Sequence, residues 1–108
     1  MNLALSPGRR LIFRNCELVK RTSYEKKFRD EMGVVWRQAF SSPDYDGRAI
    51  VYSGKLLPLK IGDIRDIKGT IKFEQNFGAH YNFPQGVNFL HISRPILIDI
   101  LPPPFTDC

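Results

Sequence analysis

Apolar and polar positions alternate in short runs along most of the chain, a pattern typical of half-buried β-strands. The clearest alternation places Ile67, Gly69, Ile71 and Phe73 on one face, with polar side chains at the positions between them. Other runs are rich in β-branched and aromatic residues, which favour strands. The pattern predicts strands at 10–20, 34–40, 48–53, 67–74, 87–93 and 96–101.

Glycine and proline positions mark the interruptions of these strands. Gly69 lies inside a strand pattern and predicts a bulge or a sharp bend. Pro58 cannot donate a ladder hydrogen bond, so Leu56–Ile61 is expected to be an extended segment at an edge or a bulge. Arg94 and Pro95 separate the last two predicted strands, and a twelve-residue loop is expected at 75–86.

Residues 22–32 fit two patterns. Thr22 and Glu25 have the spacing of a capping box, and Tyr24 and Phe28 follow at helical spacing. Two aromatic residues four positions apart also share a face of a strand. We favour a short helix here, with a strand as the alternative.

Consecutive strands without intervening helices argue for a mainly β, antiparallel fold. A chain of 108 residues allows one domain, spanning 1–108, with loose termini at 1–8 and 102–108. We predict a small OB-like barrel of five to seven short strands with one short helix, because closure removes exposed sheet edges. A β-sandwich is the second choice.

The composition bears on the location of the protein and on the distribution of its charge. Hydrophobic residues make up 43% of the chain, but no apolar run approaches the roughly 20 residues that cross a bilayer. The apolar patch at the amino terminus is too short for a signal peptide. A cytoplasmic protein without a membrane partner is therefore expected, with delivery by another route as the alternative. Residues 1–37 hold nine basic and four acidic side chains, whereas residues 38–108 hold seven of each. The whole net charge of +5 therefore lies in the first third. Such a surplus suits a polyanionic partner. Solubility alone also accounts for it, because a net charge of about 2–8 is usual in a small domain.

The residues that could carry catalysis form no familiar pattern. Cys16 and Cys108 lack metal-site spacing, and Cys16 is expected to be a small buried hydrophobe. No phosphate-binding glycine loop or nucleophile elbow occurs, so no cofactor and no metal site are predicted. A minor alternative is a small ribonuclease that uses Glu74, His80 and His91 for acid–base chemistry. We lean towards a protein that is not an enzyme.

Thirteen aromatic residues are spread along the chain, several of them beside basic residues. Four are expected to fill the core: Phe13, Trp36, Phe73 and Phe89. Five are candidate surface stackers for nucleic-acid bases: Tyr24, Tyr45, Phe77, Tyr81 and Phe83. Aromatic faces that stack bases, together with cations that follow the backbone, are typical of single-strand binding.

The leading hypothesis is a non-enzymatic protein that binds single-stranded nucleic acid, with DNA favoured, and forms a homo-oligomer. The basic groove and its stacking rings are predicted to consist of Arg14, Lys20, Arg21, Tyr24, Lys26, Lys27, Arg37, Tyr81 and Phe83. In its short strands, glycine-marked bends and aromatic loop, the chain is similar to the small OB-fold single-strand-binding proteins of bacteria and phages. The alternative is a structural or adaptor protein, such as a viral or phage assembly component, that associates through an edge strand at Leu56–Ile61 or Ile96–Leu101.

Overall fold

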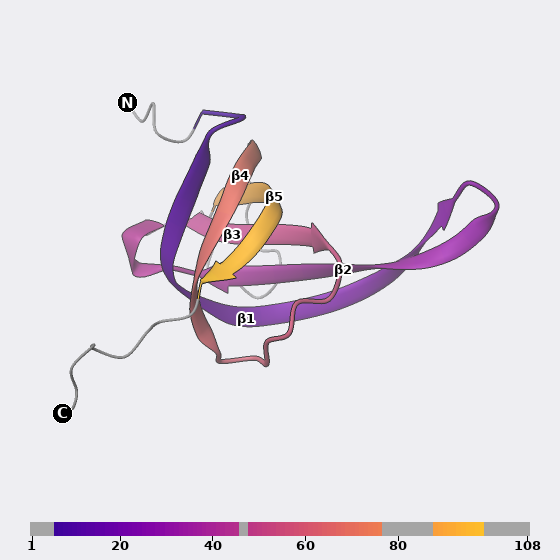
Figure 1. The fold of residues 1–108 in the computed structure, drawn as a ribbon, viewed down its shortest axis with the longest axis horizontal. Helices are drawn as coiled ribbons and strands as arrows, with labels where there is room; N and C mark the ends of the chain where they lie inside the picture. The colour runs from indigo at the N-terminus through magenta and orange to yellow at the C-terminus, as the bar shows by residue number, and fades with distance from the viewer. Residues whose placement is uncertain (1–5, 46–47, 77–87, 99–108) are drawn as a thin grey trace.

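The structure, a computed structural model, describes residues 6–45, 48–76 and 88–98. The described residues form five strands and one short 3-10 turn, which confirms the mainly β prediction (Figure 1). The elements are β1 (Arg10–Phe28), β2 (Glu31–Ser41), η2 (Pro43–Tyr45), β3 (Arg48–Gly54), β4 (Ile64–Asn76) and β5 (Asn88–Ile98).

The five strands belong to one sheet that closes on itself as a barrel in the order β1-β2-β3-β5-β4. A single closed sheet replaces the two facing sheets that a sandwich would have. The long strand β1 closes the ring, because its first half pairs with β4 and its second half pairs with β2. All neighbouring strands are antiparallel except β3 and β5, which are parallel.

The helix predicted at 22–32 is wrong. β1 continues to Phe28, turns through two residues and returns as β2, with Tyr24 paired to Val35 and Phe28 paired to Glu31. The spacing of Tyr24 and Phe28 fits a helix and a strand equally well. The strand is formed because the strand-forming run after Gly33 supplies its backbone hydrogen-bonding partners. Gly33 lies beneath the ring of Phe28, where a Cβ atom would come within 2.7 Å of Cδ2.

The paired strands extend beyond the barrel as a two-stranded ribbon, which we call the arm (residues 20–35). Figure 1 shows the arm projecting away from the other strands along the longest axis of the molecule, which measures 55 Å. Most side chains of the arm are exposed.

The barrel interior holds the main hydrophobic core. Phe13 and Cys16 are fully buried there, as predicted. Phe89 is also buried, in a second, smaller cluster with Ala39, Ala49 and Val51. Trp36 is only partly buried. The remaining core positions of the main cluster are Leu18, Phe40, Ile50, Leu59, Ile67, Ile71, Leu90 and Ile92.

Phe73 is exposed, and its predicted place in the core is wrong. The register between β4 and β5 shifts between Ile71 and Phe73, which pair with Ile92 and His91 respectively. Two steps along β4 thus match one step along β5, which is a β-bulge. The bulge inverts the alternation of β4, so Ile71 points into the barrel and Phe73 points out.

A second bulge lies at Gly69, as the sequence predicts. Lys68 pairs with Ile96 and Thr70 pairs with Ser93, so two residues of β5, Arg94 and its neighbour, lie opposite the single residue Gly69 of β4. Arg94 adopts a left-handed backbone, with φ of 50°. β5 therefore continues through this point as one strand, instead of the two strands predicted, and residues 99–101 lie outside the described residues.

Leu56–Ile61 forms no strand, and this prediction is wrong. The segment is a loop in which Leu59 is buried against the core, while Leu56 and Ile61 are exposed. Of the predicted loose amino terminus, Gly8 is attached to the sheet through its N–H, which donates to the carbonyl of Ile71 at 2.8 Å. Residues 1–5 and 102–108, with Cys108, lie outside the described residues.

Candidate functional site

A groove on the outer surface of the barrel, at the base of the arm, brings together the three exposed aromatic side chains of the described residues with three basic ones. Its volume is about 370 Å³, and all five strands contribute to it. We call it the groove and define it by its lining residues: Tyr24, Lys26, Phe28, Val35, Arg37, Ser53, Gly54, Lys72, Phe73 and His91.

Strand pairing brings these residues to one face. Tyr24 pairs with Val35 across β1 and β2, and Arg37 pairs with Ser53 across β2 and β3. Across β4 and β5, Phe73 pairs with His91. Because alternate residues of a strand share a face, Lys26 and Phe28 lie on the same side of β1 as Tyr24.

Three aromatic side chains are exposed in the parts of the chain that the structure describes, and all three line the groove. Tyr24, Phe28 and Phe73 have exposed fractions of 41, 48 and 47%. The ring of Phe73 stacks on His91, with centroids 4.3 Å apart and planes 18° apart. A barrel buries large rings when it can, so three exposed rings in one place indicate a surface that contacts something else.

Basic groups lie against these rings. The guanidinium carbon of Arg37 lies 5.2 Å from the centroid of Tyr24, and Nζ of Lys26 lies 5.7 Å from that of Phe28. Nε of Arg37 also donates to Oγ of Ser53 at 3.3 Å. Lys72 adds a third cation, and none of the ten lining residues is acidic. The groove is therefore positively charged.

His91 also lines this positively charged groove. Its Nε2 lies 2.9 Å from Oε1 of Gln75. Burial lowers the pKa of His91 below its usual value, and the positive charges of Arg37 and Lys72 lower the pKa further. The imidazole is therefore neutral near pH 7 and presents a flat ring to the groove.

Of the predicted site residues, Tyr24, Lys26 and Arg37 line the groove. Lys27 lies on the opposite face of the arm, because it alternates with Lys26. Lys20 shares the strand face of Tyr24 but is not among the lining residues. Arg21 lies elsewhere, with its Nη1 donating to the carbonyl of Leu59 at 2.5 Å, so it fastens a loop to the barrel. Tyr81 and Phe83 lie outside the described residues, as do Phe77 and His80.

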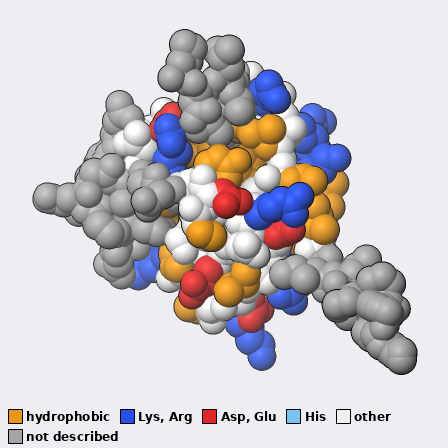
Figure 2. Space-filling model, turned by 90° about the vertical axis from the view of Figure 1, so that its left-hand side faces the viewer, with side chains coloured by type: hydrophobic (Ala, Val, Ile, Leu, Met, Phe, Trp, Pro, Cys, Tyr) orange, Lys and Arg blue, Asp and Glu red, His pale blue; other side chains and the backbone are white. Residues whose placement is uncertain are grey.

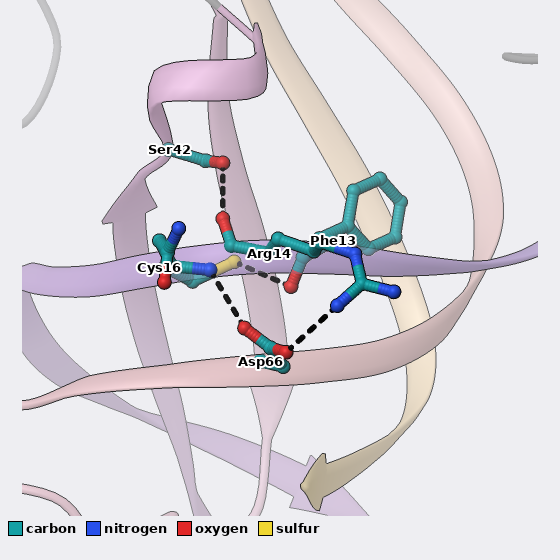
Figure 3. Close-up of polar contacts among 6 residues, drawn as sticks. Phe13, Arg14, Cys16, Ser42 and Asp66 are labelled. Atoms are coloured by element: carbon teal, nitrogen blue, oxygen red, sulfur yellow. Dashed lines mark hydrogen bonds and ion pairs between the residues drawn. The ribbon is translucent and has the colours of Figure 1, made fainter. Parts of the chain in front are cut away.

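Arg14 belongs to a structural cluster at the bend of β1 (Figure 3). Asp66 accepts the backbone N–H of Asn15 at 2.9 Å and an Nη1 hydrogen bond from Arg14 at 3.4 Å. Ser42 Oγ donates to the carbonyl of Arg14 at 2.6 Å, and Cys16 Sγ donates to that of Phe13 at 3.3 Å. Burial, with a smaller contribution from Asp66, raises the pKa of Cys16 to about 12, so its thiol is inert.

Tyr45, another predicted stacker, packs instead against Phe13, with centroids 5.2 Å apart. The structure also separates two members of the minor ribonuclease constellation. Glu74 accepts hydrogen bonds from Arg48 at 2.9 Å and Asn88 at 3.1 Å. Glu74 and His91 lie on opposite faces of the sheet, because Glu74 follows Phe73, the outward-facing partner of His91.

Among the aromatic and basic residues that line the groove, sequence reasoning missed four as binding residues: Phe28, Lys72, Phe73 and His91. Phe28 could have been found by extending the strand alternative for 22–32, in which it shares a face with Tyr24. The other three depend on the β4 bulge and on pairing between strands distant in sequence, for which the sequence carries no local signal.

The end of the barrel away from the arm differs from the groove. Figure 2 shows acidic and basic side chains interspersed there, with no face of a single charge. The described residues contain no cluster of three His, Cys, Asp or Glu side chains that could hold a metal ion. They also contain no helix long and apolar enough to span a membrane. Comparisons of the chain with protein-family models, with curated proteins and with solved structures gave no match.

Proposed function

We propose that the protein binds single-stranded nucleic acid, with DNA favoured, in the groove and does not convert it chemically. The observation that carries this proposal is the coincidence of all three exposed aromatic rings of the described residues with three cations in one groove whose lining has no carboxylate. Rings supply stacking surfaces for bases, and cations supply contacts to phosphates.

The geometry of the rings suits stacking. Tyr24 is covered on one side by Arg37, and Phe73 is covered by His91. Each ring is fixed by this contact and remains partly exposed, so its other face can receive a base. Stacking contributes about 1–3 kcal/mol per base. The bases of a duplex are already stacked on each other, which favours single strands.

The order of the strands supports an OB-like barrel. The five-stranded OB fold binds oligonucleotides on the face of its second and third strands, between the loop joining strands 1 and 2 and the loop joining strands 4 and 5. Here the groove includes residues of β2 and β3, with the arm on one side and the outer face of β4 and β5 on the other.

DNA is favoured because the groove lining offers little to recognise a 2′-hydroxyl group, which lets proteins select RNA. The lining contains no amide or carboxylate side chain, and its one aliphatic hydroxyl, on Ser53, already accepts from Arg37. A cytoplasmic location and a homo-oligomeric state belong to the same proposal, because nucleic acid is met in that compartment and single-strand binding is commonly cooperative.

Fluorescence anisotropy with a labelled oligo(dT) of about 15 nucleotides tests the proposal. We expect a Kd below about 100 μM that weakens between about 50 and 200 mM salt. Phe73→Ala should weaken binding by roughly 5- to 150-fold, the equivalent of 1–3 kcal/mol. Ile96→Ala is the control, because Ile96 is similarly exposed but lies outside the groove.

Two results would overturn the proposal: affinity that is indifferent to salt, or equal binding by Phe73→Ala and wild type. A salt-insensitive oligomer without any affinity for oligo(dT) would support the adaptor alternative instead. Tighter binding of oligo(rU) than of oligo(dT) would overturn the preference for DNA while leaving single-strand binding in place.

A further inference from the structure

One edge of the arm is without a backbone partner among the residues that the structure describes. β2 pairs with β3 only from Trp36 onwards, so residues 31–35 pair with β1 alone. In a two-residue hairpin the closing pair, here Phe28 and Glu31, exchanges both backbone hydrogen bonds, and every second pair does the same. The backbone N–H and C=O groups of Met32 and Val34 therefore point to the open edge.

The same two residues are apolar and exposed. Met32 and Val34 have exposed fractions of 61 and 55%. They alternate with Gly33 and Val35, so their side chains lie on the face of the arm opposite the groove. Exposed apolar side chains on an unpaired strand edge are the usual template for the addition of another strand.

The two edges of the arm differ in charge. Along the β1 edge lie four cations, Lys20, Arg21, Lys26 and Lys27, and one carboxylate, Glu25. Lysine-rich edges oppose pairing between copies, because like charges would meet. Residues 31–35 of β2 carry a single charge, at Glu31. A second copy of the chain therefore approaches more readily along β2 than along β1.

We propose that two copies of the chain associate through this β2 edge, antiparallel and related by a two-fold axis at Gly33. In this register Met32 of each copy lies opposite Val34 of the other, and the two residues exchange backbone hydrogen bonds. Glu31 lies opposite Val35, so no like charges meet. The two arms become one four-stranded sheet, and the interface is self-complementary, as two-fold symmetry requires.

The pairing has a consequence for the groove, which rests on the proposed function, whereas the association itself does not. The ring of Phe28 lies over Gly33 on the groove face of the arm. The Phe28 rings of both copies would therefore meet beside the axis and bring the two grooves together. Two-fold symmetry reverses the direction of one groove relative to the other, so the dimer binds two strands of opposite polarity.

Sedimentation equilibrium of the full chain, at protein concentrations from about 1 μM to 1 mM, tests the association. Wild type should show a reversible monomer–dimer equilibrium. Val34→Lys should raise the dimer Kd at least tenfold, because it places two charges in the interface. Val34→Pro should do the same without adding charge, because it removes the N–H at the open edge while leaving the bonds to β1 intact. Ile61→Lys, at a loop position of equal exposure, should leave the Kd unchanged.

Wild type that stays monomeric at every concentration would overturn the inference, as would a dimer that Ile61→Lys weakens as much as Val34→Lys does. Circular dichroism of each variant shows whether it keeps the wild-type fold. Binding of oligo(dT) separates the two proposals. Retained binding by monomeric Val34→Lys supports both of them. A wild-type dimer without affinity for oligo(dT) supports the association and overturns the proposed function.

Discussion

The two halves of β1 have different surroundings although they form one continuous strand. The first half, up to Leu18, pairs with β4 and contributes Phe13, Cys16 and Leu18 to the core. The second half pairs with β2 in the arm, and its rings, Tyr24 and Phe28, are exposed. Apolar residues in the first half are explained by folding, whereas the exposed rings of the second half lie outside the core. The comparison teaches that the same residue type fills the core in one half and, in the other, is exposed at the surface where we propose recognition.

Replacing one phenylalanine from each half gives the largest expected contrast. Phe13→Ala should lower the free energy of unfolding by about 3–5 kcal/mol, because it leaves a cavity in the core. Phe28→Ala should lower it by less than about 1 kcal/mol, because its ring is half exposed. Urea denaturation followed by Trp36 fluorescence measures both values. Equal losses would mean that the arm is as well packed as the barrel.

The junction between the halves should show an intermediate effect. Asp66→Ala removes the acceptor of the Asn15 N–H, at a position where Asn15 has a left-handed φ of 53°. Because this bond is exposed and water can replace the acceptor, its loss should lower the free energy of unfolding by about 0.5–1.5 kcal/mol. Arg14→Ala, which breaks only the exposed ion pair to Asp66, should cost at most about 1 kcal/mol. Thermal denaturation of the two variants compares them directly, and a larger loss in Arg14→Ala would contradict the role given to the bend.

The sequence predicted the first half of β1 better than the second. The apolar residues Leu11, Phe13 and Leu18 are explained by a buried strand alone, because they pack in or against the core. Tyr24 and Phe28 fit a helix and a strand equally well, and the choice between them was made by pairing with β2, which local spacing does not report. The ring closure through β4 and the parallel contact of β3 with β5 are likewise products of long-range pairing.

The candidate site, like the fold, was predicted only in part. Tyr24, Lys26 and Arg37 were found because they lie in the basic first third of the chain. Phe73 was assigned to the core because alternation along β4 places it with Ile71, and the bulge that turns it outwards is a response to the register with β5. The position of a bulge without glycine or proline is set by the fit between two strands, so the sequence pattern of one strand does not reveal it.

The groove can be compared with the rest of the barrel through two lysines of β4. Lys72 lines the groove, whereas Lys68 is exposed on the same strand and does not. Lys72→Ala should reduce the slope of log affinity against log salt by about 0.7, the value expected for one lost phosphate contact to a single strand. Lys68→Ala should leave the slope unchanged. Anisotropy titrations at four salt concentrations give both slopes, and equal changes would show that binding follows net charge and not the groove.

The smallest expected effect is the pH dependence of folding stability that His91 produces. Its pKa in the folded protein is lowered, first by burial and then by Arg37 and Lys72, so the unfolded chain takes up the proton at a higher pH than the folded one does. Stability is therefore complete above the unfolded pKa and decreases as the pH falls from there to the folded pKa. His91→Gln, which cannot titrate, should lack this part of the loss in melting experiments at successive pH values.

The same proton should act on binding in the opposite direction. Phosphates seated beside Arg37 and Lys72 would neutralise part of the charge that lowers the pKa of His91, so the complex would hold a proton more readily than the free protein. By linkage, affinity for oligo(dT) then rises as the pH falls between the free and bound pKa values, while stability falls over an overlapping range. A histidine confined to the barrel would weaken stability without strengthening binding, so opposite trends in wild type, both absent in His91→Gln, would place this residue in the groove's function as well as in its structure.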